Sequence, residues 1–147
     1  MTVIDLPFSR DEYRRRLDLT RHEMAERGLD ALFVTDPSNQ AWLTGYDGWS
    51  FYVHQGVILL PDQDPIWWGR NQDTNGALRT VWMAEDCVWG YADNYVQSTE
   101  RHPMQDLSAR LAGLGLEQGR IGVEMDNYYF SAKAFETLST TLSQVFW

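Results

Sequence analysis

A chain of 147 residues has the length of one ordinary domain, and its 44% hydrophobic and 22% charged residues are typical of a globular protein rather than a disordered or fibrous one. The 21 acidic residues against 12 basic ones give a formal charge of −9, which would repel a phosphate backbone and argues against nucleic acid as a partner. Without a leader-like start or an apolar run of about 18 residues, and with a single cysteine, the chain is expected in the reducing cytoplasm and not in a membrane.

The N-terminal part of the chain predicts a helix followed by a buried strand. Ser9 and Glu12 fit the S-x-x-E capping box, and Gly28 supplies the left-handed residue that commonly ends a helix, so we expect a helix over about residues 10–27. The unbroken apolar run 31–34 is then typical of a strand that is buried on both faces.

The middle of the chain predicts a hairpin between two helices. A short helix is expected over residues 37–43, followed by a β-rich stretch at 53–60. The proline- and aspartate-containing turn at 61–65 should return residues 66–68 as the second strand of the hairpin. Apolar residues at helical spacing then favour a helix over 72–84.

The last third alternates again between strands and helices. Alternating apolar residues predict strands at 87–91 and 121–125, and a helical stripe begins at Pro103 and ends at Gly115. Ser131 is a candidate cap for a final helix that we expect to run to the apolar end at 145–147. An apolar end suggests either that the natural chain continues or that its terminus is buried.

These elements together predict one α/β domain, spanning residues 1–147, in which helices flank a mixed β-sheet in three layers. The sequence contains none of the common hydrolase, phosphate-loop, dinucleotide or zinc motifs, so no catalytic residue and no metal ligand is assigned. His22 and His102 are expected to be structural or solvated. Cys87, within a strand pattern, is expected to be an inert thiol.

Two polar clusters are candidates for function. In residues 46–55 (YDGWSFYVHQ), aromatic rings and polar groups crowd a loop that either lines a ligand pocket or packs against a partner, and the sequence favours neither. Residues 70–75 (RNQDTN) follow the hairpin at a predicted helix start. Capping accounts for the Asn and Asp residues there, so Arg70 and Asp73 form only a secondary candidate site.

Read in order, several segments resemble the N-terminal domain of the creatinase/prolidase family: residues 8–13 (FSRDEY), 28–32 (GLDAL), 38–46 (SNQAWLTGY) and 120–124 (RIGVE). The resemblance covers essentially the whole chain. Within the family, three runs look like ectoine hydrolases: residues 46–55, 69–76 (GRNQDTNG) and 95–104 (YVQSTERHPM).

The resemblance implies a chain that lacks a C-terminal catalytic domain, which in the peptidases of the family holds two divalent metal ions. It also implies a homodimer in which this domain covers the active site of the other subunit. Creatinases use a phenylalanine of this domain to contact the substrate, and Phe51 occupies the corresponding place. Trp49, Tyr52 and His54 lie beside it in the sequence and are further candidates for substrate contact. Creatinases also use an arginine here, but Val53 stands at that place, which speaks against creatine as the substrate.

The expected function is therefore that of a non-catalytic domain of a hydrolase acting on C–N bonds, either an ectoine hydrolase or an enzyme like an Xaa-Pro dipeptidase. Its partners would be the catalytic domain of the same chain and a second subunit, and the chain itself would bind no cofactor. The alternative is a stand-alone module that binds a small molecule or another protein.

Overall fold

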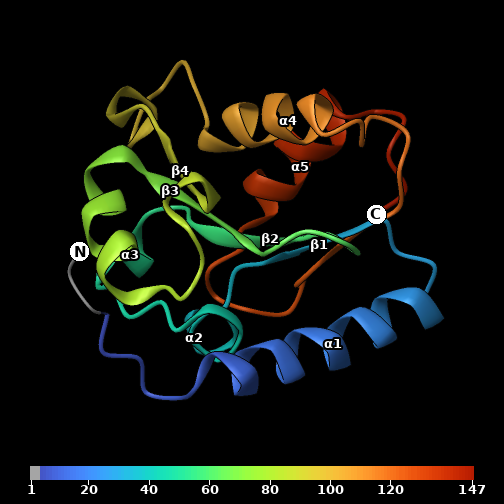
Figure 1. Cartoon of the computed structure of the whole chain (residues 1–147). Coiled ribbons are helices and arrows are strands. Elements are labelled where there is room, and N and C mark those ends of the chain that lie inside the picture. Colours follow the sequence, from blue (N-terminus) through green and yellow to red (C-terminus); the bar gives the residue numbers. More distant parts are fainter. Residues whose placement is uncertain (1–3) are drawn as a thin grey trace.

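The computed structural model describes residues 4–147, which form a mixed five-stranded sheet with helices on both faces (Figure 1). The strands are β1 (Ala31–Val34), β2 (Gly56–Leu59), β3 (Ile66–Arg70), β4 (Val88–Tyr91) and β5 (Ile121–Val123). The helices are α1 (Arg10–Glu26), α2 (Pro37–Thr44), α3 (Thr74–Thr80), α4 (Pro103–Gly113) and α5 (Ala132–Thr141). The predicted three-layer α/β class is confirmed.

The strand directions decide where the loops meet. The sheet order is β4-β3-β2-β1-β5, with β1 parallel to β5, β3 parallel to β4, and β2 antiparallel to both of its neighbours. The carboxyl ends of β1, β3, β4 and β5 therefore lie at the same end of the sheet as the amino end of β2. Segments that are far apart in the sequence meet at this end, which we call the loop end.

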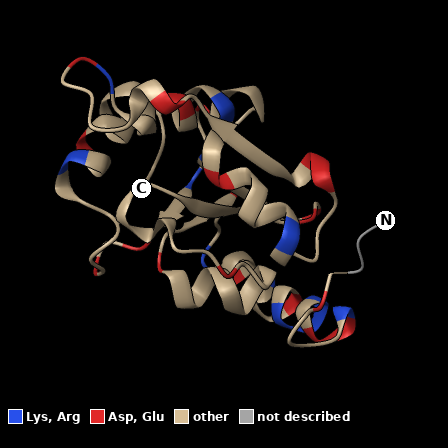
Figure 2. Cartoon of the chain, turned by 90° about the vertical axis from the view of Figure 1, so that its left-hand side faces the viewer, with Lys and Arg blue, Asp and Glu red and all other residues tan. Residues whose placement is uncertain are grey.

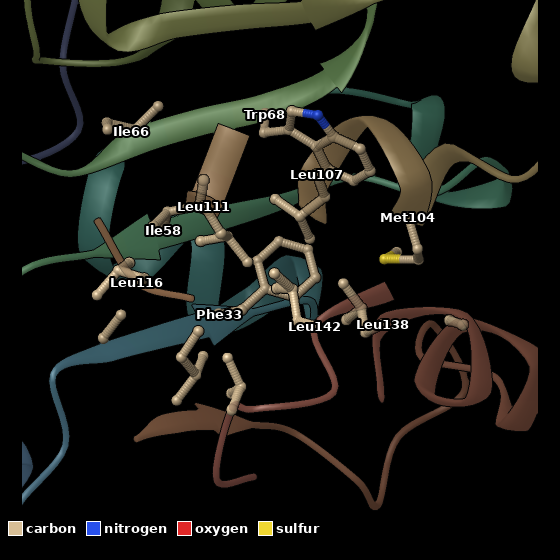
Figure 3. Packing of buried hydrophobic residues seen from close by; sticks show 14 of the residues in the cluster. Phe33, Ile58, Ile66, Trp68, Met104, Leu107, Leu111, Leu116, Leu138 and Leu142 are labelled. Carbon is tan, nitrogen blue, oxygen red and sulfur yellow. The ribbon is translucent and has the colours of Figure 1, made fainter. Parts of the chain in front are cut away.

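Both faces of the central strands β1, β2 and β3 are buried, as the unbroken apolar run 31–34 predicted for β1. Phe33, Ile58 and Trp68 point towards α4 and α5, while their neighbours Val57 and Trp67 point towards α1, α2 and α3. This alternation follows from the two-residue period of a strand. Figure 3 shows the Phe33 ring at the centre of the first cluster, close to Leu107, Leu138 and Leu142.

The first helix begins where its cap predicted, but the capping box is only half formed. The Ser9 hydroxyl accepts a hydrogen bond from the Glu12 amide at 3.2 Å. The Glu12 carboxylate pairs instead with Arg15 and Arg16, at 2.8 and 2.9 Å, because two guanidinium groups compete for it. These ion pairs hold the pKa of Glu12 well below its usual value, at about 2. Figure 2 shows basic and acidic residues interspersed along α1.

Two predicted elements are shorter than the sequence suggested. Strand β2 begins at Gly56 rather than at residue 53, because the preceding residues form a hydrogen-bonded loop. Helix α3 ends at Thr80, although the helical pattern continues to residue 84. Beyond it, the Trp82 amide donates to the Thr44 carbonyl and its indole to the Leu43 carbonyl, so the end of α2 draws this segment out of the helix.

Two predicted elements near the sheet edges are present but differ at one end. Cys87 lies in a 3₁₀ turn directly before β4 rather than in the strand. The last helix ends at Thr141, a turn follows over residues 142–144, and Phe146 then forms an isolated bridge beside the start of β5: the Ile121 amide donates to the Phe146 carbonyl at 2.8 Å. Backbone pairing with the edge strand competes with the helix here. Trp147 is half-buried and packs against Phe135, with the ring centroids 6.0 Å apart.

Within residues 4–147, no helix combines the length and the apolar character that crossing a membrane requires.

Candidate functional site

The sheet topology brings both candidate clusters of the sequence to the loop end. The 46–55 loop connects α2 to the amino end of β2, and Arg70 closes β3 at the same end. The segments that follow β4 and β5 also begin there. Residues from four separate stretches of the chain can therefore contribute to one site.

The base of the 46–55 loop is buried and fixed by hydrogen bonds. The Tyr46 hydroxyl donates to Gln55 Oε1 at 3.1 Å, the Ser50 hydroxyl donates to the same oxygen at 2.6 Å, and the two hydroxyls lie 2.8 Å apart. The Tyr46 ring packs against Trp67, with centroids 5.0 Å apart. Burial of this ring raises the pKa of Tyr46, which keeps the phenol protonated. The loop is thus tied at both ends to the core.

Above this base, aromatic side chains project into solvent. Trp49 is 84% exposed, Tyr52 69% and Phe51 41%, although large apolar surfaces are normally buried. Phe51 contacts the Tyr129 ring almost at right angles, at 6.2 Å between centroids, and Tyr128 beside it is fully exposed. Tyr128 and Tyr129 follow β5, and no sequence motif marked them as part of this site.

Arg70 and Asp73 form an ion pair rather than a helix cap. Two guanidinium nitrogens lie 2.8 and 3.2 Å from the Asp73 carboxylate, and the same guanidinium lies 5.8 Å from the centroid of the Tyr52 ring. The Asp73 side chain makes no cap bond to α3, so the capping explanation for this aspartate was wrong. The ion pair raises the pKa of Arg70 and holds its charge beside Tyr52.

His54 and His102 lie ring against ring, with centroids 4.8 Å apart. His102 Nδ1 also accepts a hydrogen bond from the Met104 amide and caps α4, so the expected structural role of this histidine is confirmed. Burial lowers the pKa of His54 to about 4, and the His102 charge adds to this effect. Burial lowers the pKa of His102 as well. Both imidazoles are therefore neutral at neutral pH.

Two pockets of about 250 Å³ each open beside these side chains. The aromatic pocket is lined by Phe51, Tyr52, Val53, His54, Tyr128, Tyr129 and Ser131. The histidine pocket is lined by Tyr52, Val53, His54, Tyr91, Tyr95, Val96, Gln97, Ser98, Arg101, His102 and Pro103. Three of the four primary candidates from the sequence line a pocket, and Trp49 stands outside both. Its ring packs on Phe51 at 6.1 Å between centroids.

Neither a cluster of metal ligands nor an activated thiol is found among the described residues. Among residues 4–147, no three His, Cys, Asp or Glu side chains converge as metal ligands. The two divalent ions that the resemblance implies for a whole enzyme therefore have no matching ligand set in this part of the chain. Burial and neighbouring carboxylates raise the pKa of Cys87 to about 11, which disfavours the nucleophilic thiolate. His22 is exposed on α1, as expected of a solvated residue.

The stability of the domain should fall on acidification because of His54. A histidine whose folded pKa lies near 4, below the reference value of 6.5, favours folding fully above pH 6.5 and loses this contribution as the pH falls towards 4. For a half-buried ring we expect a loss of about 1 kcal/mol between about pH 7.5 and about pH 5. Urea unfolding at both pH values measures it.

The His54→Gln variant should flatten this pH dependence only in part, because burial lowers the pKa of His102 in the same direction, and the exposed His22→Gln variant on α1 should leave it unchanged. Equal slopes for His54→Gln and the unmodified chain would show that the His54 imidazole does not titrate with folding. The low pKa of Glu12 affects stability only at lower pH, because that carboxylate protonates below its reference value of 4.5.

Comparison with known proteins adds an independent line of evidence. Residues 16–146 match the profile of the Creatinase/Prolidase N-terminal domain. An ectoine hydrolase of Halomonas elongata is 55% identical over 139 residues, which cover 94% of this chain and 35% of that protein. An uncharacterised hydrolase/peptidase of Sinorhizobium fredii is 36% identical over 141 residues, covering 95% of this chain and 36% of that protein.

Among solved structures, a proline dipeptidase from Streptococcus pneumoniae superposes with a TM-score of 0.68 at 24% identity, covering 88% of this chain and 87% of that one. At this identity the likeness shows the fold. The chain spans only about a third of the length of the curated relatives it matches, 35% of one and 36% of the other.

Proposed function

Because the chain belongs to the creatinase/prolidase N-terminal domain family, we propose that it is the non-catalytic N-terminal domain of a hydrolase that acts on C–N bonds. The observation that carries this proposal is the exposed aromatic surface of the 46–55 loop, held on a buried, hydrogen-bonded base. Rigid exposed rings suit contact with a ligand or partner. Among residues 4–147 no cluster of metal ligands is found, which agrees with a supporting role beside a catalytic domain.

We propose further that this loop covers the active site of a second subunit in a homodimer. Phe51, Tyr52 and Trp49 would exclude water from that site, and neutral His54 would donate a hydrogen bond to a substrate carboxylate. The catalytic groups, and any divalent metal ions, would belong to a C-terminal domain of the same parent chain. The described residues would then act only by closing the site and orienting the substrate.

For the substrate we propose ectoine, because the relative that is 55% identical is an ectoine hydrolase. The reaction would open the ring by hydrolysis of a C–N bond and release an acetylated diaminobutyrate. An Xaa-Pro dipeptide is the second candidate, and the fold likeness to a proline dipeptidase is compatible with it. Both substrates are small and carry a carboxylate, which suits the pocket beside His54.

Phe51→Ala in the two-domain parent enzyme should lower kcat/KM for ectoine about tenfold, since one aromatic wall of the closed site is lost. Steady-state kinetics with ectoine and with an Xaa-Pro dipeptide measures the effect. The matched control is Phe146→Ala, because Phe146 is also exposed but lies beside Arg120, at the opposite end of β5. If kcat/KM for both substrates were the same in Phe51→Ala and in the unmodified enzyme, the covering role would be refuted.

A further inference from the structure

Strand β5 forms one edge of the sheet, and part of that edge is open. In the order β4-β3-β2-β1-β5, strand β5 pairs with β1 on one side. On its other side the Phe146 amide donates to the Gly119 carbonyl at 3.0 Å, and the Ile121 amide donates to the Phe146 carbonyl at 2.8 Å. These two bonds make an isolated parallel bridge between Arg120 and Phe146, one residue before Trp147.

The backbone groups of β5 that follow this bridge face the same open edge. Successive residues of a strand direct their amide and carbonyl groups to opposite sides. Ile121 and Val123 therefore face outwards, while the groups of Gly122 face β1. Among residues 4–147 no other strand pairs with this edge. The Ile121 carbonyl and the Val123 amide are thus placed to form the next bonds of the ladder that Phe146 begins, and an open strand edge readily pairs with a further strand.

A groove of about 630 Å³ lies along this edge, with more than twice the volume of either pocket at the loop end. Ile121, Gly122 and Val123 line the groove, so the open backbone groups lie within it. The rest of its lining is mostly apolar and comes from both helix layers and the C-terminus: Met24, Leu29, Leu32, Met125, Phe135 and Trp147. An apolar groove beside open strand groups suits the addition of a β-strand.

We propose that this groove binds the segment that directly follows Trp147 in the parent chain, as a sixth strand parallel to β5. The inference rests on the proposed function, which places a catalytic domain after this one, and the curated relatives are about three times as long as the part that this chain matches. In the register of the Phe146 bridge, the residue after Trp147 would lie opposite Gly122. Its amide would donate to the Ile121 carbonyl, and its carbonyl would accept the Val123 amide.

The chain already enters the groove in the required direction. Trp147 lines the groove and packs against Phe135, and Figure 1 shows the C-terminus between the layer of α4 and α5 and helix α1. A segment joined to Trp147 is present at a high effective concentration. A second copy of the chain would have to displace Phe146 or pair through only Ile121 and Val123. Because the carboxyl end of β5 lies at the loop end, a parallel strand would lead the parent chain to that end.

The test compares amide hydrogen exchange in two chains: the 147-residue chain and the same chain extended by about ten further residues of the parent, the length of a long strand. In the extended chain the Val123 amide should exchange at least about tenfold more slowly, because it gains a hydrogen-bond acceptor. The Ile121 amide is bonded to Phe146 and the Gly122 amide faces β1, so both should be protected in both chains. The extension should also raise the melting temperature by about 5 °C.

Two variants show whether this gain depends on the Val123 amide. Val123→Pro removes the outward donor without removing a bond to β1, so the extension should no longer raise the melting temperature. Val123→Ala is the matched control, because it shortens the same side chain and keeps the amide, so the extension should still raise the melting temperature by about 5 °C. Each extended variant is compared with its own 147-residue form, which cancels the effect of the substitution on the rest of the domain. The hydrogen-exchange comparison needs no variant and decides the matter if Val123→Pro does not fold.

The sixth strand would be overturned if the Val123 amide exchanged equally fast in both chains, or if the extension stabilised Val123→Pro as much as Val123→Ala. Protection of the Val123 amide in the 147-residue chain that grows with protein concentration would overturn it too, by assigning the edge to a second copy. These outcomes are distinct from failure of the covering role. A protected Val123 amide in the extended chain, together with unchanged kcat/KM in Phe51→Ala enzyme, would leave the strand standing and refute the cover. The opposite pair of results would do the reverse.

Discussion

Phe33→Ala should lower the free energy of unfolding by about 4 kcal/mol, a large part of the stability of a domain of this size. The Phe33 side chain is 1% exposed and lies in the centre of the cluster between the sheet and α4 and α5 (Figure 3). Its ring meets Trp68 at 5.9 Å and Phe130 at 6.4 Å between centroids, both nearly at right angles. Truncation leaves a cavity that these large rings cannot fill without leaving their own positions.

Urea unfolding followed by circular dichroism measures this loss, with an unchanged m-value as the sign that only stability has changed. Phe33→Leu should cost less than half as much, because most of the volume is retained. Phe146→Ala, at a residue 66% exposed, should cost less than about 1 kcal/mol. Similar losses for Phe33→Ala and Phe146→Ala would contradict the assignment of Phe33 to the centre of the core.

Glu124→Ala should destabilise the domain by about 2–3 kcal/mol, because it removes the acceptor that ties the ends of β1 and β5 together. One carboxylate oxygen accepts the Thr35 amide at 2.6 Å and the Asp36 amide at 2.7 Å, and the other accepts the Asn39 side chain at 2.5 Å. Thr35 is 1% exposed, so its amide would be left buried without this partner.

Thermal and urea unfolding of Glu124→Ala test this, beside Asp126→Ala, an exposed carboxylate two residues further on that should change stability by less than about 0.5 kcal/mol. Glu124→Gln keeps one acceptor oxygen and should fall between the two. Because Tyr129 follows in the same loop, we also expect Glu124→Ala to broaden the Tyr129 ring resonances. Equal stability of the Glu124→Ala and Asp126→Ala variants would show that the carboxylate does not hold the strand ends.

Most of the fold could be predicted from local patterns because each pattern has a local physical cause. The Ser9 cap, the left-handed Gly28 at φ +64° and the turn of the β2–β3 hairpin depend on residues a few positions apart. The two misplaced helix ends involve long-range partners. Trp82 lies outside the predicted helix 72–84 because its indole and amide donate to carbonyls of α2. Phe146 lies outside the predicted final helix because its carbonyl accepts the Ile121 amide of β5.

The candidate site was predicted only as far as it is local. The crowding of aromatic rings in the 46–55 loop is visible in the sequence, and this crowding predicts that the loop contacts a ligand or a partner. The pairing of Arg70 with Asp73 could equally have been a helix cap, since both readings use residues three apart. Side-chain geometry alone distinguishes the two.

The sequence by itself determined the three-layer α/β class, the family resemblance and the 46–55 loop as the candidate place of contact. The tertiary structure alone decided that Tyr129 would stand against Phe51 and that His102 and Arg101 would share a pocket with His54. The physical reason is the direction of the strands. Parallel pairing of β1 with β5 and of β3 with β4 carries distant loops to one end of the sheet, and no pattern within a short window of sequence encodes that pairing.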